Sequence, residues 1–380
     1  MMKKICILVV AVCMVLSACS NKTNNVKFSE FNSEYVPVNE ITDTYSKALK
    51  LEYAHFTIRD SVRIADVSSV SRTLYKPSDG FLFNKEQRFI DYLNGSPVDL
   101  SKISVSSDDM GGYHQLNAEG GYPYFTDYDG GSIVWIKDED AEAFFLTNEN
   151  ITVKRYYCCN TFDDEKYKLK DCEMSISEAI EKSAEFSEGL RKIGYPQMSP
   201  FEIRVEKIND TYAFRIDMVQ QDNGVPLRAA NSGFEGRESS VNDVFTGRLS
   251  KINSNPAGYT VLITSSSDIG CFRNNENVFC EYEKENIDKV ITPYSALRYI
   301  DDNLSDNSSY EVDYIGLENK IYWVDSETGV YSSTPMWTVS LYSPTEEKLY
   351  YALVDCETGD FSFYSQSRGC LLYTSDAADD

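Results

Sequence analysis

The clearest hydrophobic pattern in the chain begins at Ser175. Ser175 and Glu178 have the spacing of a capping box, and Gly194 is placed to end a helix. Between them, apolar residues recur at steps of three and four, which predicts one amphipathic face, at Ile176, Ala179, Ile180, Ala184, Leu190 and Ile193. The pattern then changes to alternation over 201–216, interrupted by Asn209-Asp210. Such alternation around a turn-forming pair predicts a β-hairpin.

A second helix followed by strands is predicted nearer the C-terminus. Thr292 can cap this helix and Pro293 can occupy its first position, and an apolar face follows at Ala296, Leu297, Ile300 and Leu304. Strands are expected over 310–317, 320–324, 336–342 and 349–354. Two of them end in nearly the same phrase, VDSETG at 324–329 and VDCETG at 354–359. We interpret both phrases as hairpin turns that an aspartate closes.

The N-terminal half gives weaker patterns. Residues 44–53 fit a helix or an amphipathic strand, 54–67 fit strands, and 84–93 fit a short helix with Phe89, Ile90 and Leu93 on one face. Pairs of glycines between 111 and 131 separate aromatic-rich stretches and predict a short β-meander, which we expect to continue over 132–136 and 143–146.

Together these patterns predict an α+β fold. We expect a β-rich α+β N-terminal domain over 40–170. It would be followed by tandem modules, each of one helix packed on an antiparallel sheet, over 171–270 and 271–369.

Several stretches in the second half resemble the PepSY family of extracytoplasmic modules. They are EAI at 178–180, QQDNGVP at 220–226, PMW at 335–337 and VDCETGD at 354–360. The resemblance covers residues 171–364 and implies one helix lying across a small antiparallel sheet. Members of the family are associated with restraining peptidases or modulating envelope signalling, so the resemblance implies an envelope protein partner. It implies no catalytic residues.

The N-terminus has the features of a bacterial lipoprotein signal. A basic head at Lys3-Lys4 precedes an apolar run from Ile5 to Leu16, which is too short to span a bilayer. Ser17-Ala18-Cys19 then resembles a lipobox, which predicts a signal peptide over 1–18 and lipidation of Cys19. Residues 19–39 would form a flexible tether. We therefore expect a lipid-anchored protein of the bacterial cell envelope, on the extracytoplasmic side.

The net charge bears on the class of partner, and the C-terminal segment bears on how much of the chain is native. The formal net charge of −24 argues against nucleic acid as a partner, because nucleic-acid binding requires clustered Lys and Arg. The segment CLLYTSDAADD at 370–380 resembles a translated sequencing adapter, so we expect it not to be native sequence.

Six cysteines remain between these two ends, at 158, 159, 172, 271, 280 and 356. Exported proteins commonly contain disulfides, and eight residues with a turn-forming centre separate Cys271 from Cys280. We expect a disulfide between those two, and with weaker support one between Cys172 and either Cys158 or Cys159. The vicinal pair is also compatible with buried thiols. No cysteine spacing indicates a zinc site.

The sequence gives no catalytic motif. Its two histidines, His55 and His114, lie before the expected modules, and phosphate-binding, nucleophile-elbow and metalloprotease motifs are missing. We therefore expect a binding or regulatory lipoprotein without catalytic activity, cofactor or metal. One alternative is a solute- or glycan-binding lipoprotein that uses the aromatic meander, with Tyr113, Tyr122, Tyr124 and Tyr128. A carboxylate-dependent hydrolase, using pairs such as Asp108-Asp109 or Asp301-Asp302, is a further alternative.

Overall fold

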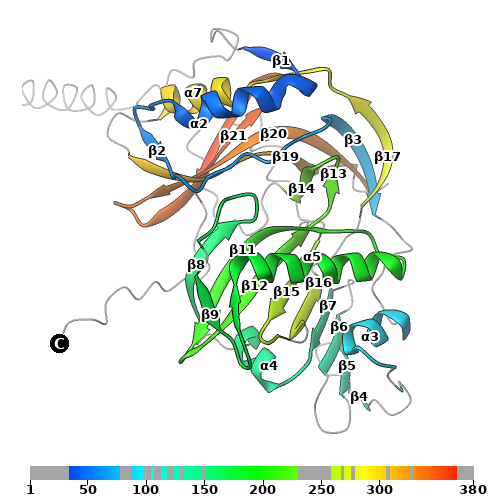
Figure 1. Cartoon of the computed structure of the whole chain (residues 1–380). Coiled ribbons are helices and arrows are strands. Elements are labelled where there is room, and N and C mark those ends of the chain that lie inside the picture. The colour runs from blue at the N-terminus through cyan, green and yellow to red at the C-terminus, as the bar shows by residue number, and fades with distance from the viewer. Residues whose placement is uncertain are drawn as a thin grey trace, which may run out of the picture.

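Two large β-sheets dominate the structure, a computed structural model (Figure 1). It describes residues 34–77, 87–97, 99, 104–106, 113–117, 124–128, 132–146, 150–163, 165–229, 258–266, 269–274, 279–304, 309–325 and 329–365. We call the two sheets the lower and the upper sheet, after their places in Figure 1.

The lower sheet has nine antiparallel strands. Their order is β4 (Ser104–Ser106), β5 (Tyr113–Asn117), β6 (Tyr124–Tyr128), β7 (Ser132–Ile136), β16 (Cys271–Asn274), β15 (Gly258–Ile263), β12 (Thr211–Val219), β11 (Ser199–Ile208) and β8 (Ile151–Tyr157). Helices α5 (Ile176–Lys192) and α3 (Gln87–Asn94) pack on one face of this sheet. Helix α4 (Glu139–Leu146) packs on part of the other face. A small hairpin of β9 (Lys166–Lys168) and β10 (Glu173–Ser175) leads into α5.

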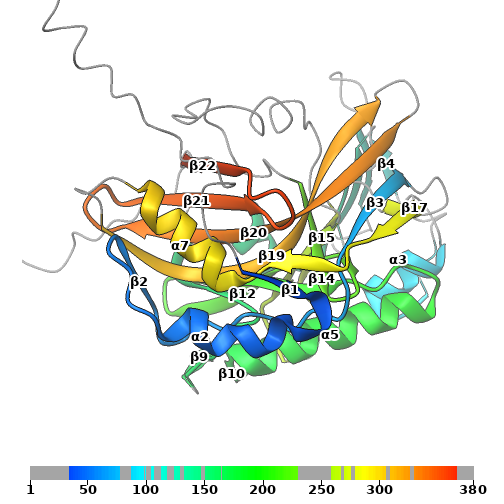
Figure 2. The ribbon, with the colours of Figure 1, turned by 90° about the horizontal axis from the view of Figure 1, so that it is seen from above.

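The upper sheet also has nine strands. Its main path is β13 (Gln221–Asp222), β14 (Val225–Ala229), β19 (Tyr310–Asp325), β20 (Val330–Ser343), β21 (Lys348–Asp355) and β22 (Phe361–Ser365). To it are added β2 (Phe56–Ile58), β3 (Ser71–Pro77) and β17 (Phe279–Asn286). One face is covered by the 3-10 helix η2 (Val38–Thr44), α2 (Tyr45–Lys50) and α7 (Pro293–Asn303), as Figure 2 shows from above. Beside them, β1 (Tyr35–Pro37) pairs with β18 (Lys289–Ile291).

The predicted fold class is wrong. The protein is mainly β, with two large sheets in place of tandem helix-on-sheet modules. The expected β-rich N-terminal domain does not form a unit of its own either, because its strands are divided between the sheets. Strand β7 pairs with β16, whereas β2 pairs with β19 and β3 pairs with β17 and β20. Strand pairing joins residues that are remote in the sequence, and local periodicity contains no information about such partners.

The predicted helix caps of the second half and two of its turns are confirmed. Ser175 and Glu178 form the capping box of α5, and Thr292 caps α7 with Pro293 in its first turn. The β11–β12 hairpin turns at Asn209, whose φ of 51° is left-handed. Asp355 closes the turn after β21 by accepting hydrogen bonds from the backbone N–H of Glu357 and Thr358, at 2.8 and 3.0 Å.

Other local predictions need correction. Residues 143–146 belong to helix α4, not to a strand, and 310–325 form one continuous strand instead of two. The ambiguous 44–53 stretch contains the short helix α2. The meander strands β5, β6 and β7 pair as expected, while the glycine pairs between 111 and 131 lie outside the described residues.

Candidate functional site: a polar seam between the sheets

The lower and upper sheets meet through side chains that are unusually polar for an interior. Strands β8, β11 and β12 contribute from the lower sheet, and β14, β19 and β21 contribute from the upper sheet. We call this cluster the seam; it consists of Arg155, Tyr157, Glu202, Arg204, Asp217, Arg228, Glu318, Lys320 and Tyr351. Charged residues are rarely buried unless they are paired, so this arrangement is the strongest candidate for a functional site in the described residues.

Arg155 on the edge strand β8 connects the two sheets. Its Nη2 donates to Glu202 Oε2 at 2.5 Å in the lower sheet and to Tyr351 Oη at 3.2 Å in the upper sheet. Tyr157 and Tyr351 share a hydrogen bond between their hydroxyls, 3.1 Å apart. Directly after β8, the Asn160 side chain donates to the backbone oxygen of Asp313 in β19, at 2.8 Å. Strand β8 is therefore tied to both sheets.

Arg204 and Asp217 form the second ion pair of the seam. Arg204 Nη2 donates to Asp217 Oδ2 at 2.9 Å, and Thr260 Oγ1 donates to Asp217 Oδ1 at 2.8 Å. Burial raises the pKa of the Asp217 carboxyl, but the charge of Arg204 and the Thr260 hydrogen bond outweigh burial and leave the pKa below its ordinary value. Asp217 is therefore held as a carboxylate.

Glu318 and Lys320 form the third pair, on one face of β19. The Glu318 side chain is 2% exposed and the Lys320 side chain 5% exposed. Burial raises the pKa of Glu318, but the positive charges of Lys320 and Arg228 outweigh it and lower the pKa overall. Arg228 lies on β14, in register with Lys320 on the parallel strand β19.

Aromatic side chains close one end of the seam. The rings of Tyr157 and Tyr314 stack at 4.1 Å, and Phe201 packs edge-on against both, with centroids 5.6 Å away. The register of β11 shifts between Pro200 and Glu202, which leaves Phe201 as an extra residue. This bulge explains why Phe201 joins the seam while Ile203 and Val205 face α5, although the sequence predicts that all three share one face.

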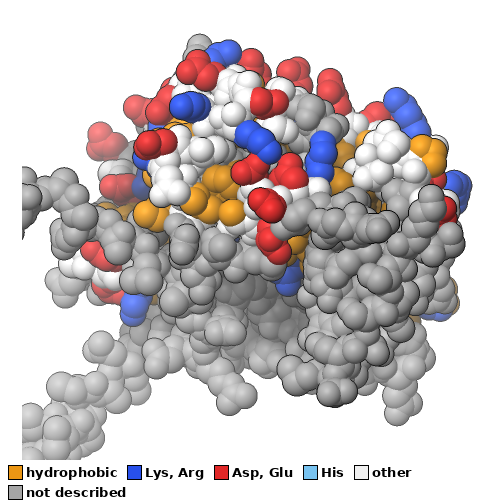
Figure 3. All heavy atoms as spheres, turned by 90° about the horizontal axis from the view of Figure 1, so that it is seen from below, with side chains coloured by type: hydrophobic (Ala, Val, Ile, Leu, Met, Phe, Trp, Pro, Cys, Tyr) orange, Lys and Arg blue, Asp and Glu red, His pale blue; other side chains and the backbone are white. Residues whose placement is uncertain are grey.

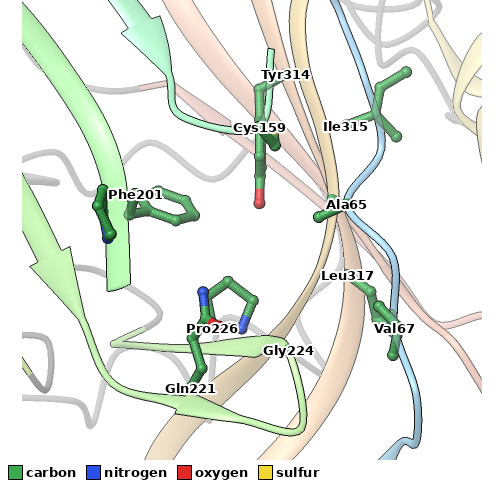
Figure 4. Close-up of a pocket in the computed structure, with 12 residues that line it drawn as sticks. Ala65, Val67, Cys159, Phe201, Gln221, Gly224, Pro226, Tyr314, Ile315 and Leu317 are labelled. Carbon is green, nitrogen blue, oxygen red and sulfur yellow. The ribbon is translucent and has the colours of Figure 1, made fainter. Parts of the chain in front are cut away.

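A small cavity of about 50 Å³ lies beside these rings (Figure 4). The Phe201 ring and the Tyr314 hydroxyl point into it from different sides, and Gln221, Gly224 and Pro226 of the β13–β14 hairpin line it below. A cavity needs about 10–15 Å³ to hold one water molecule, so this one has room for a few waters or a short apolar group.

The outer edge of β8 is the second notable feature of this region. Strand β8 ends the lower sheet, and no described strand pairs with its other edge. Ile151 and Val153 at its start are large apolar side chains, 48% and 45% exposed. An open edge of this kind can accept a further strand. Figure 3 shows the molecule from below, where charged side chains of both signs lie around a central group of hydrophobic side chains.

The residues singled out from the sequence do not meet at the seam. Cys19 and Tyr122 lie outside the described residues, and only the backbone is described for Tyr113, Tyr124 and Tyr128, which belong to β5 and β6. The expected Cys271–Cys280 disulfide is not formed: both are free cysteines, Cys271 buried on β16 and Cys280 exposed on β17. Cys158, Cys159 and Cys172 are free as well.

The histidine and carboxylate candidates from the sequence take part in no common site. His55 Nδ1 lies 3.0 Å from Asp301 Oδ1, and the Asp301 carboxylate also accepts the backbone N–H groups of Ala54 and His55, each at 2.8 Å. Asp301 thus joins two segments of the upper half, and Asp108-Asp109 lie outside the described residues.

Within the described ranges, no group of three or more His, Cys, Asp or Glu could hold a metal ion. No helix in that part of the chain is long and apolar enough to cross a membrane.

The sequence does contain a signal for the seam: charged residues alternate along two of its strands. Glu202, Arg204 and Glu206 lie at successive alternate positions of β11, and Glu318 and Lys320 are likewise two positions apart on β19. Alternating charges usually indicate a solvated strand face. Only the approach of a second sheet turns these faces into an interior.

Comparisons with known proteins support the fold but no function. No family model matches the chain, and no curated protein matches it. It is similar to the crystal structure of an uncharacterised protein from Eubacterium rectale, with a TM-score of 0.55 and 15% sequence identity over 81% of this chain and 90% of that one. At this identity the similarity shows a shared fold alone.

Proposed function

We propose that this protein is a lipid-anchored extracytoplasmic lipoprotein that binds and regulates another protein of the cell envelope and has no catalytic activity. Its anchor would be the lipid on Cys19. The open edge of β8 carries the proposal, because it combines a strand edge with which no described strand pairs with two exposed apolar side chains, Ile151 and Val153. The partner would add a strand there, with main-chain hydrogen bonds for affinity and side-chain contacts for specificity.

The seam supports a binding role in a second way. Arg155 and Tyr157 hold the C-terminal part of β8 against the upper sheet, while Ile151 and Val153 at its N-terminal part remain exposed. A strand that is rigid at one end and open along its edge is preorganised for a partner, which lowers the entropic cost of binding.

A pull-down from detergent-solubilised membranes, with the full-length protein as bait, tests whether it captures a protein partner. We expect Ile151→Lys and Val153→Lys together to abolish capture and leave the melting temperature unchanged, because charged edge residues discourage strand addition. Tyr282→Lys is the matched control: Tyr282 is 60% exposed on β17, in the other sheet, and its replacement should leave capture intact.

Three results would contradict the proposal. Equal capture by the double variant and the control would exclude the β8 edge, and retention of a Cys19→Ala variant in the membrane fraction would exclude the lipid anchor. Hydrolysis of an envelope substrate by the purified protein would exclude a purely binding role.

A further inference from the structure

The upper sheet extends beyond the open edge of β8. Tyr157 on β8 stacks on Tyr314 of β19, whereas the Phe201 ring on the next strand, β11, lies 4.2 Å from the guanidinium carbon of Arg228. Arg228 is in register with Lys320, which lies further along β19 than Tyr314. A step from β11 to β8 therefore leads toward the start of β19, and a further step past β8 leads to that end of the upper sheet. Figure 1 shows β8 on the same side of the molecule as β2, which pairs with the start of β19.

Side chains at that end of the upper sheet share the face of the seam. Ser340 and Tyr351 lie opposite each other on β20 and β21, and the Tyr351 hydroxyl belongs to the seam. Tyr342 and Leu349 form the pair two positions closer to the β20–β21 turn, and side-chain alternation places them on the same face. Glu311 of β19 lies opposite Tyr342. We call Glu311, Tyr342 and Leu349 the ledge; all three residues are partly exposed.

The backbone of β8 is oriented for pairing beside the ledge. The backbone N–H of Cys158 donates to the backbone oxygen of Phe201 on β11, at 2.8 Å. Backbone groups alternate in direction along an antiparallel pair, so those of Arg155, opposite Arg204, are directed away from β11 to the open edge. The Arg155 side chain reaches Tyr351, which adjoins the ledge on β21. A strand added there would pair with β8 and turn one face toward the ledge.

We infer that the strand added at β8 is a basic, amphipathic segment of the partner, with its apolar side chains against the ledge. This inference rests on the proposed strand addition and names the chemistry of the added strand. Tyr342 and Leu349 continue the packed interface between the two sheets, so alternate apolar side chains of the added strand would be removed from water there. Ile151 and Val153 add exposed apolar surface at the start of β8.

Carboxylates outnumber basic side chains around this place. The described charged residues that border the ledge or the outer edge of β8 are the acidic Asp163, Glu165, Glu311, Glu346 and Glu347 and the basic Arg59, Lys154 and Lys348. Asp60 and Arg63, one of each sign, leave this balance unchanged. Arg59 already pairs with Glu311, and Lys154 with Glu165. Lys or Arg on the added strand would therefore be attracted, and Asp or Glu repelled.

Peptide binding to the full-length protein tests the inference. The probe is a rhodamine-labelled peptide of about eight residues, long enough for one strand, in which Val and Lys alternate. Its control has Glu in place of every Lys. At physiological ionic strength we expect fluorescence anisotropy to show saturable binding of the Val–Lys peptide and about tenfold weaker binding of the Val–Glu peptide. Equal affinity for the two peptides would overturn the inference of a basic strand.

Variants assign the binding to the ledge. Tyr342→Ala together with Leu349→Ala should weaken binding of the Val–Lys peptide about tenfold, because two apolar contacts are lost. Leu51→Ala is the matched control: Leu51 is 40% exposed and follows α2, which covers the opposite face of the upper sheet. Its replacement should leave the affinity unchanged. Equal weakening by the ledge variant and the control, or no weakening by either, would overturn the inference.

Backbone methylation tests for pairing with β8. N-methyl groups on the valines block hydrogen bonds along one edge of the peptide, and N-methyl groups on the lysines block those along the other. We expect at least one of the two methylated peptides to lose binding, because one edge must pair with β8. Unchanged binding of both would overturn pairing at the strand edge.

Further results separate this inference from the proposed function. If Ile151→Lys with Val153→Lys abolishes capture in the pull-down while the ledge variant captures as much partner as the wild type, strand addition stands and the ledge is excluded. If no partner is captured but the Val–Lys peptide binds in a ledge-dependent manner, the regulatory role fails and the ledge stands. A dimer of the protein that the ledge variant dissociates, measured by analytical ultracentrifugation, would show that a second copy occupies the ledge and would overturn the inference.

Discussion

The apolar layers under α5 and α7 and the seam are built in opposite ways. On the outer faces, α5 and α7 cover apolar layers in which Phe214, Ile216, Trp337 and Val339 are fully buried. At the seam, side chains with less exposure than many core residues are charged, as at Glu318 and Lys320. Both regions are packed. Burial of apolar surface stabilises the layers under the helices, whereas ion pairs at the seam must compensate the desolvation of its charged side chains.

This difference indicates separate roles. Apolar layers tolerate changes that preserve volume, because dispersion and burial have no direction. An ionic seam has fixed donors and acceptors, so it specifies how one sheet sits on the other. We regard the outer layers as the source of stability and the seam as the part that is organised for recognition.

The largest effect is expected from Trp337→Ala in the outer layer of the upper sheet. Trp337 is fully buried, and its Nε1 donates to the backbone oxygen of Ile291 at 2.8 Å. Loss of the ring should lower the free energy of unfolding by about 3–5 kcal/mol in denaturant titrations. Trp337→Phe should cost clearly less, because it keeps most of the volume. Similar losses of unfolding free energy for the two variants would show that the stability of this layer does not depend on the buried volume at position 337.

A smaller effect is expected from Arg155→Met in the seam. The change leaves Glu202, whose side chain is 7% exposed, with only the 3.4 Å contact to Arg204 Nε. We expect a loss of about 2–4 kcal/mol, since an unpaired buried charge is destabilising. The double variant Arg155→Met with Glu202→Leu should recover part of that loss, because both charges are then absent. If the double variant is no more stable than Arg155→Met alone, the unpaired charge of Glu202 is not the cause of the loss and the contrast between the two regions fails.

The smallest effect is the dependence of stability on pH at Asp217. The folded-state pKa of this carboxyl lies below its ordinary value of 3.8, so the unfolded chain binds more protons in that range. Its contribution to stability is therefore fully present above about pH 4 and is lost as the pH falls through the folded-state pKa. We expect the difference in unfolding free energy between the wild type and Asp217→Asn to shrink between pH 5 and pH 2. A constant difference over this range would show that the carboxyl is not stabilised by Arg204 and Thr260.

Part of the candidate site was accessible from the sequence. The alternating charges of β11 and β19 mark strand faces that carry charge, and the Asn223-Gly224 pair is typical of the turn between β13 and β14. The bulge that brings Phe201 beneath Arg228 could not be predicted, because it depends on the register between β11 and β12.

The sequence by itself determined the features whose atoms lie within a few residues of one another. The capping box of α5, the cap and proline of α7, the left-handed turn at Asn209 and the Asx turn at Asp355 all depend on hydrogen bonds or dihedral angles within about four residues. Only the tertiary structure decided that the N-terminal strands divide between two sheets and that two charged faces meet at a seam. Those outcomes depend on strand pairing across hundreds of residues, where burial and hydrogen bonding between remote segments choose among many patterns that the local sequence allows equally.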